Sequence, residues 1–137
     1  MIQYTRQVKK MKSERNTLQK KVILDELMHM MDHPTADRIY QEIHKKYPTI
    51  SRATVFRNLK MLAEQGKVLH IPISNGADCY ESITKPHYHV KCNSCGRVED
   101  VIFPYMDNLE SEVQSIDGGF AITGHSLVFE GMCDKCR

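Results

Sequence analysis

The sequence predicts an α+β protein, in which an N-terminal winged helix-turn-helix is followed by a small α/β dimerisation domain with a structural zinc site. Three helical patterns ahead of a β-hairpin indicate the first domain, and two C-x-x-C pairs indicate the zinc. Charge also divides the chain: residues 1–70 hold fourteen Lys and Arg against seven Asp and Glu, whereas residues 71–137 hold five against ten. A basic half joined to an acidic, cysteine-rich half suggests a polyanion-binding module coupled to a metal module.

We expect the first domain to span residues 1–84 and the second to span residues 85–137, with Lys85-Pro86 as the linker. Residues 1–13 are polar and basic without periodicity, which we interpret as a mobile arm or a frayed helix. No stretch is long and apolar enough to span a bilayer, and the basic N-terminus lacks the apolar core of a secretory signal. Cysteines spaced as metal ligands fit a reducing compartment, so we expect a cytoplasmic protein without membrane attachment.

The first helix is predicted over Leu18 to Asp32, behind the cap-type residues Asn16 and Thr17. Apolar side chains recur there with helical spacing and predict one buried face: Ile23, Leu27, Met30 and Met31. Because a residue before proline avoids the helical region, His33-Pro34 ends this helix.

The second and third helices carry clear boundary signals. Thr35 caps the second helix, which ends at Tyr47-Pro48, and Ser51 caps the third, which ends at Gly66. The predicted inward-facing residues are Ala36, Ile39, Tyr40 and Ile43 in the second helix, and Val55, Leu59 and Leu62 in the third. A hairpin follows, with strands in Lys67–Ile73 and Asp78–Ile83 and a turn at Asn75-Gly76.

In a winged helix-turn-helix the third helix enters the major groove of DNA and the hairpin lies over the phosphates. The solvent face of the predicted third helix offers residues that contact phosphates and base edges: Arg52, Thr54, Arg57, Asn58 and Lys60. Taken alone, this face is equally typical of an ordinary solvated helix. The hairpin and the basic charge of this half favour DNA binding.

The second domain is predicted as strand, strand, helix and strand. His87 to Lys91 form the first strand, Val98 to Ile102 form the second, and Pro104 begins a helix over Tyr105 to Ile116. The third strand lies within Phe120 to Glu130. So small a unit has a thin core, and we expect it to gain buried surface by pairing with a second copy.

The cysteine pairs predict a closed metal site. The four ligands are Cys92, Cys95, Cys133 and Cys136. Four thiolates with no open position are typical of structural Zn(II), and the alternatives are a pair of disulfides or two unrelated turns. His87 and His89 lie just upstream with a spacing that places both imidazoles on one face of a strand, which indicates a second metal site.

From about Arg15 onward, the chain resembles the ferric uptake regulator family of metal-dependent repressors. The segments that carry the resemblance are His33-Pro34-Thr35-Ala36-Asp37, Ser51 to Leu59, His87 to Gly96, and Cys133 to Cys136. The resemblance implies a homodimer with a winged-helix DNA-binding domain, a C-terminal dimerisation domain and a regulatory metal site at the hinge. It also implies an A/T-rich palindromic operator in double-stranded DNA.

By position, the resemblance implies five regulatory ligands: His33, Glu81, His87, His89 and Asp100. Imidazoles and carboxylates without a thiolate suit Fe(II), Mn(II) or Zn(II). The His-Tyr-His run and Asp100 resemble the peroxide-sensing branch, in which bound Fe(II) reacts with hydrogen peroxide and the histidines matching His33 and His87 are oxidised. Glu81 departs from that branch, where aspartate is typical, and instead resembles the iron-sensing branch.

Two further metal-binding possibilities involve residues outside the five regulatory ligands. The iron branch has an additional site, of which two positions fall on Asp107 and His125, but the other two are Pro86 and Tyr88. We therefore expect that site to be incomplete, with His125 in a structural role. Cys79 shares a strand face with Glu81, and a thiolate there would favour Zn(II) and zinc sensing; the alternative is a cysteine packed in the wing.

The resemblance also implies DNA contacts. Arg15 matches a basic residue that enters a narrow A/T-rich minor groove, and Phe56 stands where the family usually has tyrosine. Together with residues of the predicted third helix, these positions give the full set of expected DNA contacts: Arg15, Ser51, Arg52, Thr54, Phe56, Arg57 and Asn58.

Functions of other classes explain less. A metal-dependent hydrolase would use the same histidines and carboxylates, but it leaves the basic module without a purpose, and no nucleophile motif is visible. A zinc ribbon that binds a protein partner leaves the third-helix pattern unexplained. We therefore expect a regulator rather than an enzyme.

Overall fold

A computed structural model describes residues 2–30 and 32–137 of the chain. The chain divides into two compact units, of which the first comprises residues 1–70 and 77–84 and the second comprises 71–76 and 85–137. No helix within the described ranges has the length and apolarity needed to cross a membrane.

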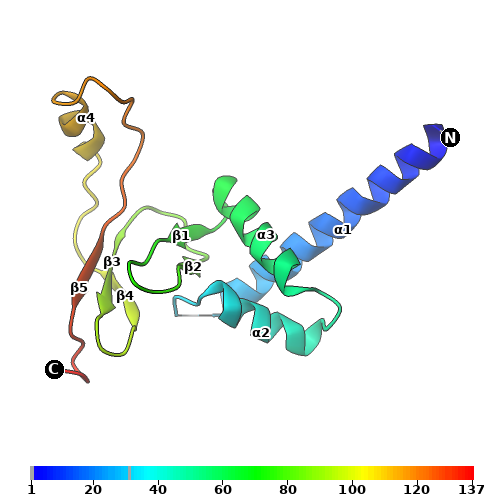
Figure 1. Ribbon diagram of the computed structural model, residues 1–137, viewed down its shortest axis with the longest axis horizontal. Helices are drawn as coiled ribbons and strands as arrows, with labels where there is room; N and C mark the ends of the chain where they lie inside the picture. Colours follow the sequence, from blue (N-terminus) through cyan, green and yellow to red (C-terminus); the bar gives the residue numbers. More distant parts are fainter. Residues whose placement is uncertain (1, 31) are drawn as a thin grey trace. The chain divides into compact units, whose positions relative to one another are not determined.

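The first unit contains three helices and a two-stranded sheet (Figure 1). The elements are α1 (Ile2–His29), α2 (Ala36–Lys46), α3 (Arg52–Glu64), β1 (Leu69–Ile71) and β2 (Cys79–Glu81). The core of this unit comprises buried apolar side chains of all three helices and the segments after α2 and α3: Ile23, Leu27, Ile39, Ile43, Ile50, Val55, Leu59, Leu62 and Val68. Three helices with a short hairpin confirm the winged-helix prediction.

Helix α1 is longer than predicted, and its N-terminal half projects beyond α2 and α3 (Figure 1). Residues 2–13 are helical, which agrees with the helix named as one of the two expectations for this segment, so the predicted helix start behind Asn16 and Thr17 is wrong. The hydroxyl of Thr17 donates to the carbonyl of Ser13 at 2.9 Å, a bond made within a helix rather than at its start. Good helix formers without Gly or Pro sustain the extension. Met30 packs against the core, and Met31 lies outside the described residues.

The caps of α2 and α3 are as predicted. The side chain of Thr35 accepts from the backbone N–H of Arg38 at 3.3 Å, and that of Ser51 accepts from the N–H of Thr54 at 3.1 Å. Gly66 follows α3 with a φ of 72°, a left-handed conformation that favours glycine. The wing has shorter strands than predicted, but Asn75 has a φ of 57°, as a turn at Asn75-Gly76 requires.

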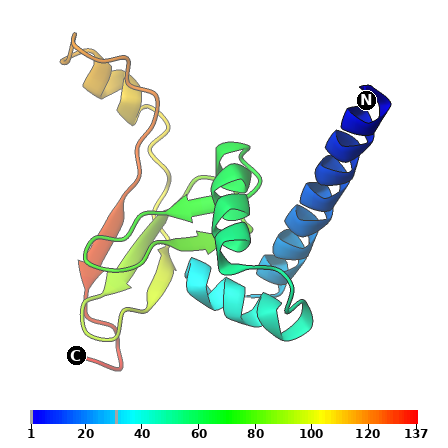
Figure 2. The same cartoon turned by 45° about the vertical axis from the view of Figure 1, so that its right-hand side comes forward.

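The second unit contains a three-stranded sheet in the order β4–β3–β5, shown clearly in Figure 2. Its elements are β3 (Tyr88–Cys92), β4 (Val98–Val101), α4 (Leu109–Gln114) and β5 (Val128–Gly131). Strand β3 pairs antiparallel with β4 and parallel with β5, so it is central. The large residues Ile102, Phe103, Ile116 and Phe120 are exposed, which reflects the thin core of this unit.

Two elements of the second unit are shorter than predicted. The helix expected over Tyr105 to Ile116 begins only at Leu109, so Pro104 is not in its first turn. The strand expected within Phe120 to Glu130 is formed only at Val128–Gly131. Helix α4 buries none of its residues, so no packed face selects a longer helix.

Candidate metal centres and DNA-binding face

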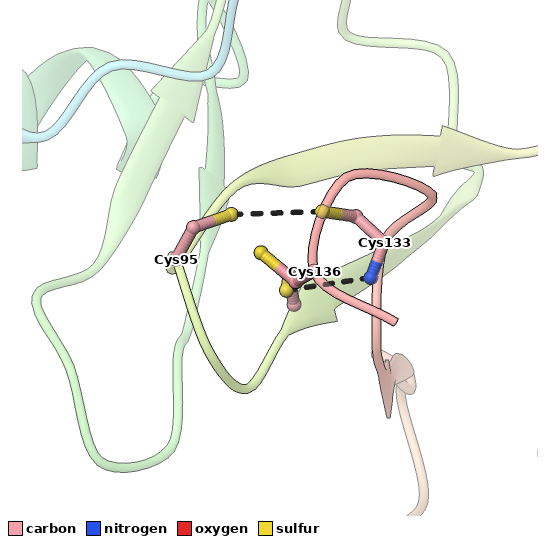
Figure 3. Close-up of side chains that lie close together, drawn as sticks. Cys95, Cys133 and Cys136 are labelled. Atoms are coloured by element: carbon pink, nitrogen blue, oxygen red, sulfur yellow. Dashed lines mark hydrogen bonds between the residues drawn. The ribbon is translucent and has the colours of Figure 1, made fainter.

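The four predicted zinc ligands lie together in the second unit. Cys92 ends β3 and Cys95 lies in the turn that follows, while Cys133 and Cys136 follow β5. Because β3 and β5 run parallel with Cys92 opposite Gly131, both cysteine turns emerge at the same end of the sheet. The four sulfurs lie within 4.8 Å of one another, and Figure 3 shows three of these cysteines with their sulfurs turned inward.

The geometry of these cysteines fits Zn(II). All four cysteines are free, with no disulfide between them in this structure. A Zn–S bond of about 2.3 Å in a tetrahedron separates two sulfurs by about 3.8 Å, and the sulfurs of Cys95 and Cys133 are 3.8 Å apart. The backbone N–H of Cys133 donates to the sulfur of Cys92, and this bond is the main reason that the pKa of Cys92 falls to about 6. The pKa of Cys136 rises instead to about 11, mainly through its hydrogen bond with Cys133, so the two thiols differ in how readily they ionise for a metal.

A second group of potential ligands in this unit consists of His87, His89 and Asp100. The two histidines flank Tyr88 along β3, so their imidazoles leave the same face of the strand, and their ring centroids are 4.5 Å apart. The β3–β4 register places Asp100 opposite His89. One carboxylate oxygen of Asp100 lies 3.0 Å from Nε2 of His87 and 3.4 Å from Nε2 of His89.

The orientation of His87 suits metal binding. Its Nδ1 lies 2.6 Å from the carbonyl oxygen of Lys85, an acceptor that stabilises the tautomer protonated at Nδ1. That tautomer leaves Nε2 as the lone-pair nitrogen, on the side of Asp100. Two imidazole nitrogens and a carboxylate are a donor set for divalent Fe, Mn or Zn.

The remaining predicted ligands, His33 and Glu81, form a pair within the first unit. The backbone N–H of Tyr80 donates to the carbonyl of Pro34 at 2.9 Å, and Thr35 and Cys79 form an isolated antiparallel bridge. These contacts align the segment before α2 with β2. Consequently Nε2 of His33 lies 2.6 Å from Oε2 of Glu81, and the two side chains are only 11% and 7% exposed.

The structure gives His125 a role without a metal. Its Nε2 lies 2.7 Å from the hydroxyl of Tyr88, and its Nδ1 hydrogen-bonds Glu110, which lowers the pKa of that carboxyl. The Tyr88 hydroxyl also accepts the backbone N–H of Met106 at 3.1 Å. Among the described residues, neither Asp107 nor His125 belongs to a cluster of three or more potential metal ligands.

Cys79 is buried in β2, and its thiol donates to the carbonyl of Ala77 at 3.8 Å. It also lies outside every cluster of three or more potential ligands in the described part of the chain. This position agrees with a cysteine packed in the wing.

Several predicted DNA contacts line one open pocket of about 890 Å³ in the first unit. The pocket lies between the middle of α1 and the start of α3, and its lining includes Arg15, Lys21, Ser51, Thr54 and Arg57. Arg15 and Arg57 are exposed there. Lys21, six residues after Arg15 in the same basic helix, also lines this pocket and is not among the predicted contacts.

The other predicted contacts differ in accessibility. Arg52 is exposed, with its guanidinium above the ring of Phe56 and paired with Asp37. Asn58 is only 1% exposed, and its Nδ2 donates to the carbonyl of Thr54 at 2.9 Å, so its prediction as a DNA contact is wrong. Asn58 lies three positions after Val55, which is on the buried face of α3. This helical spacing could have revealed that Asn58 is buried.

Comparison with known proteins decides which family these features represent. The sequence profile described as the ferric uptake regulator family matches residues 11–130. The chain belongs to the ferric uptake regulator family. It is a metal-binding transcriptional regulator of that family, whose members bind DNA as dimers and are regulators rather than enzymes.

Individual relatives of this family member include regulators of the peroxide response. The peroxide operon regulator of Bacillus subtilis is 35% identical over 122 residues, which cover 89% of this chain and 83% of that protein. A peroxide-responsive repressor of Staphylococcus saprophyticus is also 35% identical, over 123 residues that cover 90% of this chain and 82% of its own.

Solved structures of the family share the fold. The Campylobacter jejuni peroxide stress regulator matches with a TM-score of 0.76 and 33% identity, covering 95% of this chain and 97% of that one. The Helicobacter pylori ferric uptake regulator matches with a TM-score of 0.72 and 22% identity, over 97% of this chain and 91% of that one. At that identity the second match supports the fold alone.

Proposed function

We propose that this family member represses transcription as a homodimer on an A/T-rich palindromic operator, and that hydrogen peroxide relieves the repression. The observation that carries the proposal is the group formed by His87, His89 and Asp100, whose carboxylate oxygen lies within 3.4 Å of both imidazole nitrogens. The pair His33–Glu81 supplies further donors of the same chemistry. In the proposal, one regulatory Fe(II) or Mn(II) ion binds all five side chains, with Zn(II) as an alternative, while Zn(II) occupies the cysteine site.

Ligands drawn from both units would make DNA binding depend on the metal. An ion shifts a conformational equilibrium only as far as it binds one state better than another. His33 and Glu81 belong to the DNA-binding unit, and the other ligands belong to the second unit. An arrangement that brings all five donors to one ion is therefore favoured when metal is present, and the two recognition helices of the dimer then keep a fixed spacing.

The homodimer is supported by the apolar surface of the second unit. Ile102, Ile116 and Phe120 are 105%, 88% and 75% exposed. Large exposed apolar patches on soluble proteins mark sites of contact with another protein or a membrane. Pairing with a second copy would cover such residues and add to a thin core.

Peroxide sensing is supported by the relatives with peroxide in their names and by Asp100. Bound Fe(II) would activate hydrogen peroxide so that one of its oxygen atoms is inserted into a ring C–H bond of His33 or His87 and the other leaves as water. The imidazole is thereby oxidised by two electrons, and its loss as a ligand would release the arrangement that fits the operator. His33 is 11% exposed at its side chain, so this residue is screened from bulk oxidants.

Glu81 favours a second candidate function, an iron- or zinc-uptake regulator that responds to the metal alone. Its side chain is one methylene longer than the aspartate typical of the peroxide-sensing branch. Carboxylate length changes how many positions around an ion remain open to a small molecule.

One experiment separates these functions. Operator binding by the full-length zinc-loaded protein is measured by gel shift on A/T-rich palindromic duplexes, with Fe(II), Mn(II) or Zn(II) added, before and after hydrogen peroxide. We expect Fe(II)- and Mn(II)-dependent binding, release by peroxide from the Fe(II) form alone, and one added oxygen on the peptide with His33 or His87. Release without histidine oxidation, or no release, would favour the second candidate.

A further inference from the structure

Arg52 is held in place from two sides. Its Nε and Nη2 both lie 2.7 Å from Oδ1 of Asp37. Its Cζ lies 4.3 Å from the centroid of the Phe56 ring, as in a cation–π contact. The arginine is nevertheless 57% exposed. An exposed arginine usually samples many rotamers, whereas this one is fixed before any partner arrives, so binding through it loses less entropy.

Asp37 occupies one edge of the Arg52 guanidinium and leaves another edge open. A carboxylate oxygen that accepts from Nε and Nη2 occupies the side of the planar fork. The other edge of the guanidinium, formed by N–H groups of Nη1 and Nη2, points away from Asp37. That edge matches two acceptors side by side on a planar group.

Arg52 also lies at the position of a recognition helix that contacts base edges. It is the first residue of α3, directly after the cap Ser51. In helix-turn-helix proteins the N-terminal residues of the recognition helix contact base edges in the major groove. An arginine beside a carboxylate is less suited to a phosphate, because the pair carries little net charge. The hydrogen bond from Arg52 keeps the pKa of Asp37 below its usual value.

We propose that the Arg52–Asp37 pair reads a G·C base pair within each half of the operator. The open edge of the guanidinium donates to O6 and N7 of guanine, and the Asp37 carboxylate is suited to accept from N4 of the paired cytosine. An A·T pair presents an amino group where the guanidinium needs an acceptor. The ring of Phe56, at a position where the family usually has tyrosine, packs against the guanidinium of Arg52.

This inference rests on the proposed operator binding, and its test keeps the two separate. The Mn(II)-loaded full-length protein is used to select duplexes from a library with a random central segment. We expect A/T-rich palindromes with one G·C pair at a fixed position in each half. Replacing that pair with A·T should weaken binding by roughly 5- to 150-fold, as a lost bidentate contact does.

Variants assign the preference to the pair. R52A should lose the G·C preference at that position alone, whereas R52K, which keeps the charge and can still donate to guanine, should keep the salt dependence of binding. R38A is the matched control, since Arg38 forms an exposed ion pair with Asp32 outside the recognition helix and is 52% exposed. It should select the same sites as the wild type.

Results that contradict the proposed function differ from results that contradict only the role of Arg52. If the wild type enriches no duplex at all, the proposed function fails and the inference fails with it. If A/T-rich palindromes are enriched without a fixed G·C pair, or if R52A retains the G·C preference, only the role of Arg52 is overturned. A uniform loss of affinity for all sequences in R52A, with a smaller salt dependence, would identify Arg52 as a phosphate contact and also overturn the inference.

Discussion

Asp100 lies directly opposite His89 across the antiparallel pair β3–β4, and its carboxylate oxygen is 3.4 Å from Nε2 of that histidine. The same oxygen is 3.0 Å from Nε2 of His87, two residues earlier on β3. A sheet register, rather than a local sequence motif, therefore brings this carboxylate to both imidazoles.

Replacing Asp100 by alanine is expected to weaken regulatory metal binding by roughly tenfold or more, because a carboxylate donor is lost while the imidazoles stay in place. Competition with a fluorescent chelator measures the affinity for Mn(II). E99Q is the matched control, because Glu99 is the neighbouring carboxylate on β4 and pairs with Arg97 at 3.2 Å. Equal affinities for D100A and E99Q would remove Asp100 from the ligand set.

Replacing His33 by alanine is expected to abolish metal-dependent operator binding while leaving a folded protein with its structural zinc. Loss of this partner leaves the buried Glu81 less well satisfied, which should cost about 1–3 kcal/mol of stability. Gel shifts with and without Mn(II) measure the first effect, and chemical denaturation measures the second. H29A is the control, because His29 is exposed at the end of α1. Retained metal dependence in H33A contradicts the proposed ligand role.

Replacing Cys92 by serine is expected to remove the structural zinc and to lower the unfolding temperature sharply, because zinc binding contributes directly to folding energy. Zinc content by mass spectrometry and thermal unfolding with and without a chelator provide the measurements. C79A, at the buried cysteine of β2, should lose about 1 kcal/mol and keep its zinc. Zinc loss in C79A, or full zinc retention in C92S, would show that the cysteine site is assigned wrongly.

Replacing Tyr88 by phenylalanine is expected to lower the free energy of unfolding by about 1–3 kcal/mol, because His125 and the N–H of Met106 each lose a buried partner. Urea denaturation measures this change. Y105F is the control, since it keeps the ring that stacks on His125 at a centroid distance of 4.8 Å. A Y88F protein as stable as Y105F would mean that the Tyr88 hydroxyl bonds contribute nothing net.

Local features of the chain were predictable because their causes are local. The caps Thr35 and Ser51 each bond an N–H three residues away, and each C-x-x-C pair closes within one turn. The spacing of apolar residues in α2 and α3 identified their buried faces. Asn58 occupies a position on the buried face of α3, although a polar side chain is typical of the solvent face. Helix α4 was overestimated because no packed partner in this chain fixes its length.

The sequence by itself predicted the three helices of the first unit, the caps of α2 and α3, and the four cysteines that cluster in the second unit. Only the tertiary structure decided which distant side chains meet. Arg52 and Asp37 lie fifteen residues apart, and Tyr88 and His125 lie 37 apart, yet each pair is within hydrogen-bonding distance. Such contacts depend on how helices pack and which strands pair, and neither periodicity nor spacing records the direction of a side chain across that distance. The physical reason is that propensity and capping act over a few residues, whereas the bonds that fix Arg52 and His125 form only once the whole unit has closed around its core.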